Sequence, residues 1–314
     1  MTDVLTFGEA MVSLRADGPI GTGGTLRTSV AGAEANVAIG LARLGHHVRW
    51  VGRTGKDAFG DLVLRTLRAE GVDIGHALRA DRPTGIVVFE PRLSDLVRVD
   101  YHRRGSAGSR LTPDDLGEAL AALPRVVHAT GVTAALGPGP LETVRLALRT
   151  ASEAGVLTCF DVNHRTKLWS RDEAAGALRP LVRHIDVLVA SDDELALAAP
   201  AEARCEADRV AALLALGVRE VVVKRGADGA EVFDSAGSTA RPAVRVSVRD
   251  TVGAGDAFVA GYLSGLLDGD PVDRRLDRAV TAGAFAVASL GDWEGLPGRE
   301  ELDLLRIAPG DVLR

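Results

Sequence analysis

Short apolar runs alternate with amphipathic stretches along the first seventy residues. Residues 4–7 and 47–51 are short and largely apolar, as in buried strands. Residues 37–44 and 57–70 place apolar side chains at helical spacing, and a glycine follows each of these segments as a stop signal. This β-α-β-α rhythm predicts a parallel sheet with helices on its faces.

The rhythm breaks where three further segments have the pattern of strands. Residues 86–90 and 97–102 are joined by a polar turn, and residues 11–15 form a third candidate strand. We expect these segments to form a small separate sheet, with strands inside residues 10–30 and 84–104. Such a sheet is either a lid over a cleft or an ordinary surface hairpin.

From Thr112 the alternation resumes and continues to residue 290. Strands are predicted at residues 126–129, 156–162, 186–190 and 220–224, with antiparallel edge strands at 230–233 and 244–248. Helices are predicted at residues 113–123, 140–154, 171–183, 192–199, 206–216, 257–267 and 272–290. Pro180 should kink or break its helix. Without an internal repeat or a long linker, we predict one α/β domain over residues 1–314.

Composition narrows the function classes. The 314 residues are 46% hydrophobic, enough for a large core without disulfides or metal. The net charge of −6 argues against a protein that binds nucleic acid or a membrane surface. Two cysteines, Cys159 and Cys205, suit a reducing compartment. We find neither a secretory signal nor an apolar run of the roughly 18 residues that a membrane span needs, and therefore expect a cytoplasmic protein.

The strongest chemical signal is the stretch 250–261. Gly253 and Gly255 lie between a predicted strand and a predicted helix, and Asp256 follows directly. A glycine-rich turn at a helix N-terminus leaves backbone N–H groups free for an anion, and the helix dipole adds roughly half a positive charge. The stretch is therefore either a site for developing negative charge with an acid or base beside it, or a plain helix start capped by Asp256.

Other strand ends also carry candidate ligands. Lys224 ends a predicted strand, and Gly226 and Gly229 behind it either permit close approach to a nucleotide or form a plain turn. Asn163 follows another strand, as a turn former or as a polar ligand. Residues 191–194 match a helix capping box, which is a structural alternative to a role at the site.

Familiar nucleotide and metal motifs are not matched. The spacing around Lys56 differs from that of a P-loop, and Phe258 occupies the third glycine position of a dinucleotide-binding fingerprint. The chain has no zinc-ligand pattern. These mismatches argue against P-loop enzymes and Rossmann dehydrogenases.

Two motifs together resemble the PfkB, or ribokinase-type, family of carbohydrate kinases. The first is AGAEANVA at residues 31–38, where Ala31 replaces the family's usual glycine, and the second is DTVGAGDAF at residues 250–258. The resemblance runs through nearly the whole chain. It implies a ribokinase-like three-layer α/β/α sandwich with a small β-sheet lid, and phosphorylation of a sugar hydroxyl with ATP and Mg²⁺.

The resemblance also implies roles for single residues. Asp256 would be the base that takes the hydroxyl proton, and the backbone of Gly253, Ala254 and Gly255 would hold the transferring phosphoryl group. The nucleotide-binding positions of the family fall on Asn163, Lys224, Gly226, Gly229, Gly253 and Gly255. Glu194 matches a glutamate that organises Mg²⁺ indirectly, through water, although Ser191 replaces the asparagine of that motif.

The acceptor is suggested by a finer resemblance, to 2-keto-3-deoxygluconate kinases, in segments 101–109, 161–169 and 291–295. It implies that Arg103 and Arg165 hold the carboxylate of a sugar acid, through contacts worth roughly 1.5–3 kcal/mol each. The implied substrate-binding positions are Gly32, Asn36, Tyr101, Arg103, Arg165, Asp256 and Asp292.

Two departures bear on this assignment. Ser13 stands where ribokinases and fructokinases usually carry an aspartate, which argues against ribose and fructose, and Val87 stands where the finer group often has an aromatic residue. Another sugar kinase of this fold and a non-catalytic sugar-acid-binding protein remain open alternatives. A lid of exposed strands needs a cover, and related kinases commonly pair this way, so a homo-oligomer is expected.

Overall fold

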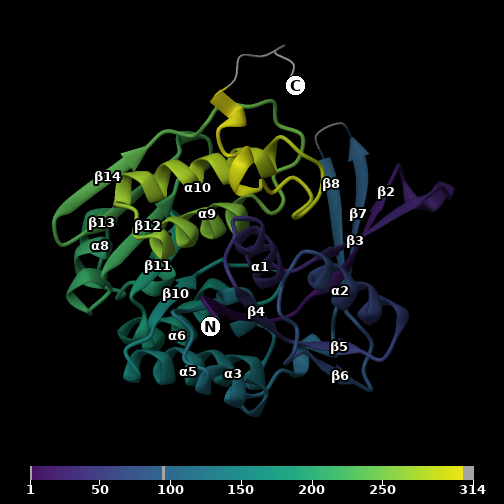
Figure 1. Cartoon of the computed structure of the whole chain (residues 1–314), viewed down its shortest axis with the longest axis horizontal. Helices are drawn as coiled ribbons and strands as arrows, with labels where there is room; N and C mark the ends of the chain where they lie inside the picture. The colour runs from purple at the N-terminus through teal and green to yellow at the C-terminus, as the bar shows by residue number, and fades with distance from the viewer. Residues whose placement is uncertain (1, 94–95, 307–314) are drawn as a thin grey trace.

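The computed structural model describes residues 2–93 and 96–306, and it is built around an eight-stranded sheet (Figure 1). The strand order is β14-β13-β12-β11-β10-β9-β1-β4. The strands are β1 (Val4–Phe7), β4 (Val48–Val51), β9 (Val126–Thr130), β10 (Leu157–Asp161), β11 (Val187–Ser191), β12 (Glu220–Lys224), β13 (Ala230–Asp234) and β14 (Gly237–Arg241). Neighbours from β4 to β12 pair in parallel, whereas β13 and β14 form an antiparallel edge.

Helices cover both faces of this sheet, as its doubly buried strands require. On one face lie α1 (Ala33–Arg43), α2 (Ala58–Ala69), α9 (Ala254–Asp268) and α10 (Val272–Val287). On the other lie α3 (Gly117–Ala121), α4 (Gly131–Ala134), α5 (Pro138–Glu153), α6 (Arg171–Leu178), α7 (Leu195–Ala198) and α8 (Glu206–Ala215). Along β1, Val4 enters the first core, and Leu5 and Phe7 enter the second. These are the three layers predicted from the sequence.

A second, four-stranded sheet stands beside the main one, at the right of Figure 1; we call it the small sheet. It has the order β3-β2-β7-β8, with strands β2 (Met11–Ala16), β3 (Leu26–Ala31), β7 (Ile86–Leu93) and β8 (Leu96–His102). Strands β2 and β7 are parallel, as the long connection between them allows. Residues 94 and 95, in the polar turn expected between β7 and β8, lie outside the described residues. A two-stranded parallel pair, β5 (Arg53–Gly55) and β6 (Leu78–Ala80), was not predicted.

The small sheet turns an apolar face toward the main body. Met11, Ala31, Val87 and Phe89 form a buried cluster, and Val252 of the glycine-rich stretch packs against it. The small sheet therefore contacts the stretch that was singled out for its chemistry.

One strand prediction was wrong. Residues 244–248 do not pair with β13; that place is taken by β14, which follows the tight turn after Asp234. The alternating valines instead line a pocket beside α10, and the chain there is irregular. Arg245 lines the same pocket, so the alternating pattern of this segment marks neither a sheet face nor one side of the chain.

Several helix boundaries differ from the predictions: the helix predicted at residues 113–123 starts as a 3-10 helix at Pro113–Leu116, and α1 and α9 begin earlier than predicted, at Ala33 and Ala254. The helix predicted at residues 171–183 becomes a 3-10 helix from Arg179, because Pro180 cannot donate a hydrogen bond, so the expected break is confirmed. The helix predicted at residues 192–199 begins only at Leu195.

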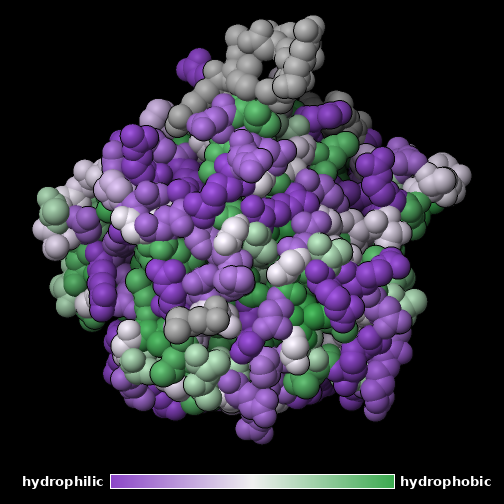
Figure 2. Space-filling view, viewed as in Figure 1, coloured by the Kyte–Doolittle hydropathy of each residue, from purple (hydrophilic) through white to green (hydrophobic). Residues whose placement is uncertain are grey.

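Polar side chains dominate the face shown in Figure 2, with apolar side chains in small groups between them. Within the described ranges, no helix combines the length and the apolar character that crossing a membrane would demand. The assignment of residues 1–314 to one domain stays a prediction.

Candidate active site

The glycine-rich stretch separates two pockets. The larger, of about 780 Å³, lies beside α9, α10 and the end of β12. The smaller, of about 300 Å³, lies between the small sheet and the main body. Thr251 and Gly255 line both pockets, so the turn forms the wall between them. A group at this wall can therefore contact the occupants of both.

The turn has the local geometry that its glycines predict. Gly253 is the N-cap of α9 with a φ of 76°, in the left-handed region. A Cβ at this position would lie 1.9 Å from the carbonyl oxygen of Asp292. A Cβ at Gly255 would lie 3.5 Å from Nζ of Lys224. The first-turn N–H groups of α9, free of helical partners, thus open beside a cation.

Asp256 lies in the first turn of α9 and is buried. The amide of Asn36 donates to its Oδ2 at 2.8 Å, and the amide of Asn163 lies 3.4 Å from its Oδ1. Burial raises the pKa of Asp256 to about 6, while the Asn36 hydrogen bond and the charge of Arg165 limit the rise. The carboxylate is mostly ionised at neutral pH yet basic enough to accept a proton, which suits a general base.

All the positions predicted for substrate binding line the smaller pocket. They are Gly32, Asn36, Tyr101, Arg103, Arg165, Asp256 and Asp292. Asn163, predicted for nucleotide binding, lines this pocket rather than the larger one, and its φ of 40° is one that asparagine tolerates. Segments far apart in the sequence therefore meet around one cavity.

The two arginines predicted for carboxylate binding differ in environment. Arg103 is largely buried and already paired, with its Nε donating to Glu9 Oε2 at 2.7 Å. The hydroxyl of Ser106 also donates to the buried carboxylate of Glu9. Arg165 is exposed at the pocket and donates to the carbonyl of His164 at 3.1 Å, and among the described residues it has no carboxylate partner. Arg165 is therefore the freer cation.

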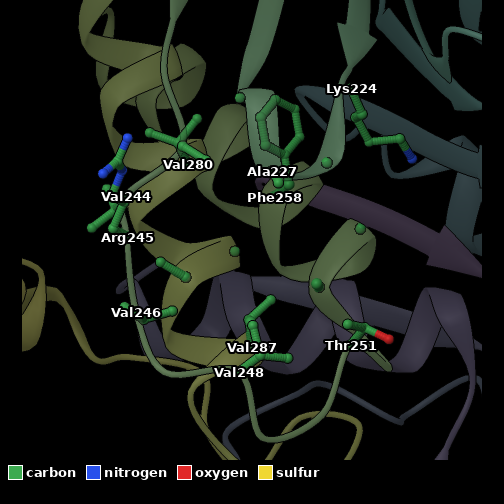
Figure 3. A pocket seen from close by; sticks show the side chains of 17 residues that line it. Lys224, Ala227, Val244, Arg245, Val246, Val248, Thr251, Phe258, Val280 and Val287 are labelled. Carbon is green, nitrogen blue, oxygen red and sulfur yellow. The ribbon is translucent and has the colours of Figure 1, made fainter. Parts of the chain in front are cut away.

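The larger pocket has apolar walls (Figure 3). Val244, Val246 and Val248 come from the irregular segment, and Val280 and Val287 come from α10. Lys224 lies on the other side of the pocket in Figure 3, and Gly226, Gly229 and Gly255, all predicted for nucleotide binding, also line the pocket. Gly253, predicted for the same role, lines only the smaller pocket. Such a cavity suits a flat apolar group with a charged group near Lys224.

Lys224 is held by a buried ion pair. Its Nζ lies 2.8 and 2.9 Å from the two carboxylate oxygens of Asp161, at the end of β10. Burial alone would lower the pKa of Lys224, but Asp161 and Glu194 outweigh it and raise that pKa above its usual value. The ammonium thus stays charged beside the glycine turn.

Glu194 does not line either pocket in the described structure. Its carboxylate accepts from the N–H of Ser191 at 3.0 Å and from the N–H of His164 at 2.6 Å. The bond from Ser191 fits the capping alternative only in part, because α7 begins at Leu195 with Glu194 as its N-cap and the hydroxyl of Ser191 donates to Asp193. Both bonds occupy the carboxylate, so Glu194 does not face either pocket directly. Within residues 2–93 and 96–306, no cluster of three or more His, Cys, Asp or Glu side chains could hold a metal ion directly.

Sequence reasoning missed two charged residues at this site, Glu9 and Arg15. Glu9 lines the smaller pocket, and Arg15 contacts Asp250 and Asp292 from β2. The available signal was a charge inside or beside an otherwise apolar predicted strand. Such a charge needs a partner when it is buried.

Two pockets share the glycine turn as a common wall, and the buried Asp256 lies at that wall. This is the arrangement of an enzyme that transfers a group between two bound molecules. Residues 1–298 match the family described as pfkB family carbohydrate kinase, and the chain belongs to that family. The protein is a carbohydrate kinase, and the predicted ribokinase-like fold is confirmed.

Similar proteins include curated sugar-acid kinases. A 2-dehydro-3-deoxygluconokinase of Thermoproteus tenax is 38% identical and covers 98% of this chain and 95% of its own length. A 2-dehydro-3-deoxygalactonokinase of Haloferax volcanii is 33% identical, and the match covers 92% of this chain and 92% of that protein. A solved structure, of a candidate Ribokinase II from E. coli in complex with ATP and Mg²⁺, has a TM-score of 0.91 at 25% identity, with 98% of this chain and 99% of that chain covered.

Proposed function

We propose that this kinase transfers the terminal phosphoryl group of ATP to 2-keto-3-deoxy-D-gluconate, giving the 6-phosphate. The observation that carries the proposal is the smaller pocket. It combines a buried carboxylate at the phosphoryl cradle, Asp256, with a free cation, Arg165. A hydroxyl at one end and a carboxylate at the other are the features of a sugar acid. The two curated relatives act, by name, on acids of this kind.

Asp256 is the proposed base. Its carboxylate takes the proton of the sugar hydroxyl while that oxygen attacks phosphorus and the bond to the leaving ADP oxygen breaks. The N–H groups of Gly253, Ala254 and Gly255 stabilise the negative charge on the transferring group, and Lys224 adds a positive charge from the nucleotide side. The amide of Asn36 orients the base.

ATP and Mg²⁺ are the proposed cofactors. The apolar walls of the larger pocket fit a purine ring, and Gly226 and Gly229 leave room for close approach of the backbone to phosphates. Both oxygens of Glu194 already accept backbone hydrogen bonds, so this residue fits a metal only through water. Mg²⁺ usually keeps several waters and would supply charge neutralisation on the phosphates.

The carboxylate of the sugar acid is assigned to Arg165 and Arg103. Because Glu9 neutralises much of the charge of Arg103, Arg165 provides most of the net attraction. Tyr101, Gly32 and Asp292 are left to contact the sugar chain. Asn163, through its contact with Asp256, acts where the sugar hydroxyl meets the phosphates.

A panel of acceptors tests the proposal. ADP release is measured with 2-keto-3-deoxygluconate, its galacto epimer, ribose and fructose at fixed ATP and Mg²⁺. We expect turnover on the sugar acids and little on ribose or fructose. Activity confined to the neutral sugars would refute the sugar-acid assignment, and binding without turnover of any acceptor would favour a non-catalytic sugar-acid-binding protein.

The base is tested by Asp256→Asn. Asparagine keeps an oxygen for the Asn36 amide but cannot accept the proton, so turnover should fall by about 10²–10⁴-fold with ATP binding retained. The matched control is Asp172→Asn, an exposed aspartate in the first turn of α6. Near-normal turnover of Asp256→Asn would show that the base is misassigned.

We infer that the small sheet is a lid and also an interface in a homo-oligomer. Leu26, Leu96 and Val97 on its strands are 45%, 56% and 48% exposed, which is unusual for apolar side chains of a sheet edge left in water. Light scattering after gel filtration should show an oligomer for the wild type and dissociation for Val97→Glu. A wild-type monomer would refute this part.

We infer a cytoplasmic location from the two free cysteines, Cys159 and Cys205.

A further inference from the structure

Arg15 of the small sheet reaches two carboxylates beside the sugar pocket. Its Nη1 lies 2.6 Å from Asp250 Oδ2, and its Nη2 lies 3.1 Å from Asp292 Oδ2. The three side chains are 19%, 13% and 7% exposed, so the pairs are largely shielded from water. The guanidinium also stacks on the ring of Phe89 from β7, 4.1 Å from its centroid. Arg15 is thus held on the small sheet by Phe89, and its charged group pairs with two carboxylates of the main body.

Each of its partners holds part of the glycine turn. Asp250 Oδ1 accepts the N–H of Val252 at 3.1 Å, and Asp250 Oδ2 lies 3.4 Å from the N–H of Gly291. The carbonyl oxygen of Asp292 lies 1.9 Å from the place that a Cβ of Gly253 would take. One guanidinium therefore ties together the small sheet, the start of the phosphoryl cradle and the segment that carries Asp292.

We propose that Arg15 is a positioning residue that couples the small sheet to the sugar pocket, keeps Asp292 aimed at a substrate hydroxyl and favours its ionised form. The inference rests on the proposed function, because it takes Asp292 as a sugar ligand. Arg15 itself acts through Asp250 and Asp292 rather than by contact with the substrate.

The electrostatic setting explains why Asp292 needs this cation. The carboxylate faces Arg15 from β2, Glu294 from its own segment and Asp256 from α9. Burial raises the pKa of Asp292 to about 7, Arg15 limits the rise, and the two acidic neighbours add to it. Without Arg15, the pKa of Asp292 would rise further, and its carboxyl group would be protonated for more of the time at neutral pH. A protonated carboxyl accepts hydrogen bonds less well than a carboxylate.

The test compares Arg15→Gln and Arg15→Lys with a matched control, Arg27→Gln. Arg27 is exposed on β3 and directly opposite Arg15 in the sheet register. Steady-state constants for sugar acid and ATP are measured from pH 5 to 9, together with thermal melting. We expect Arg15→Gln to raise the sugar KM by about 10–100-fold, the loss of a charged hydrogen bond, with ATP KM little changed.

The pH profile separates positioning from a merely structural role. In Arg15→Gln, the acid limb of kcat/KM for the sugar should move up by about one pH unit, because removal of an opposite charge raises the pKa of a carboxyl group. Arg15→Lys keeps the positive charge but cannot contact two carboxylates at once as a guanidinium does. Its acid limb should therefore match that of the wild type, whereas its sugar KM should recover only in part. If Arg15→Gln melts early, Arg15→Lys still decides the question.

Several results would overturn the inference. One is an Arg15→Gln enzyme whose sugar KM and acid limb match those of Arg27→Gln. A second is an Arg15→Gln enzyme whose sugar KM and ATP KM rise equally. A third is an Arg15→Lys enzyme whose acid limb is shifted as far as that of Arg15→Gln. These outcomes differ from failure of the proposed function, which would appear as a wild-type enzyme that phosphorylates no sugar acid. In that case the role given to Asp292 falls as well.

Discussion

Replacing Gly253 with alanine tests the phosphoryl cradle, and the same helix supplies a control. Gly253 and Gly269 cap the two ends of α9, with φ values of 76° and 79°. At Gly269 an added Cβ meets nothing within 4 Å, so alanine there costs only the left-handed backbone, roughly 1–2 kcal/mol. At Gly253 the same backbone cost is joined by a clash.

The size of that clash follows from the structure. The added Cβ would lie 1.9 Å from the carbonyl oxygen of Asp292, where contacts under 3.0 Å are essentially never seen. The neighbour is backbone, so either the turn or the Asp292 segment must move by about 1 Å. A displacement of about 1 Å at reacting groups can reduce turnover by about 10²-fold.

Both variants are purified and compared for thermal melting, ATP binding and turnover of the preferred sugar acid. Gly269→Ala should melt a few degrees lower and keep near-normal kcat, whereas Gly253→Ala should remain folded and lose about 10²-fold in kcat. If the two variants lose stability and kcat to the same extent, the turn does not place the transferring group, and the reasoning fails.

Four further results are expected. Because the pKa of Asp256 is raised to about 6, kcat should rise as pH increases through 6 and then level off, and a flat profile from pH 5 to 8 would contradict its role as base. Arg165→Ala should raise the sugar-acid KM by about 10–100-fold with ATP KM little changed, whereas equal changes in both would argue against carboxylate binding. Lys224→Met should raise the ATP KM and lower kcat, measured by ADP release, since it removes the buried cation beside the turn. A change in the sugar KM alone would contradict a role for Lys224 on the nucleotide side. Glu34 is fully buried with its pKa raised to about 7 from 4.5, so its contribution to stability is present below pH 4.5 and is lost as pH rises through 7. Urea unfolding should therefore show wild type losing up to about 3 kcal/mol relative to Glu34→Gln between pH 4.5 and 8, and a constant difference would contradict the burial argument.

The main sheet was predictable because its strands are buried on both faces. Segments such as β1 and β12 are short apolar runs ended by polar or glycine residues, a pattern that needs no knowledge of distant contacts. The edge that carries the ligands follows from the same reasoning, since parallel strands end on one side. The positions of Lys224 and of the glycine turn were therefore expected to converge.

Other features depend on contacts that a linear pattern does not contain. Strand β3 begins with the exposed residues Leu26 and Arg27, and it forms because β2 lies beside it. The pairing of Arg103 with Glu9 joins residues 94 positions apart, and only the fold reveals how much of that arginine's charge is neutralised. The valines at residues 244–248 line a cavity in an irregular segment, which periodicity cannot distinguish from a strand.

Thr251 and Gly255 belong to the walls of both cavities. A shared wall makes donor and acceptor binding energetically linked: any shift of that backbone when one molecule arrives changes the free energy for the other. Such linkage is reciprocal, so the factor by which nucleotide alters sugar affinity must equal the factor by which sugar alters nucleotide affinity. This linkage would need no separate regulatory site.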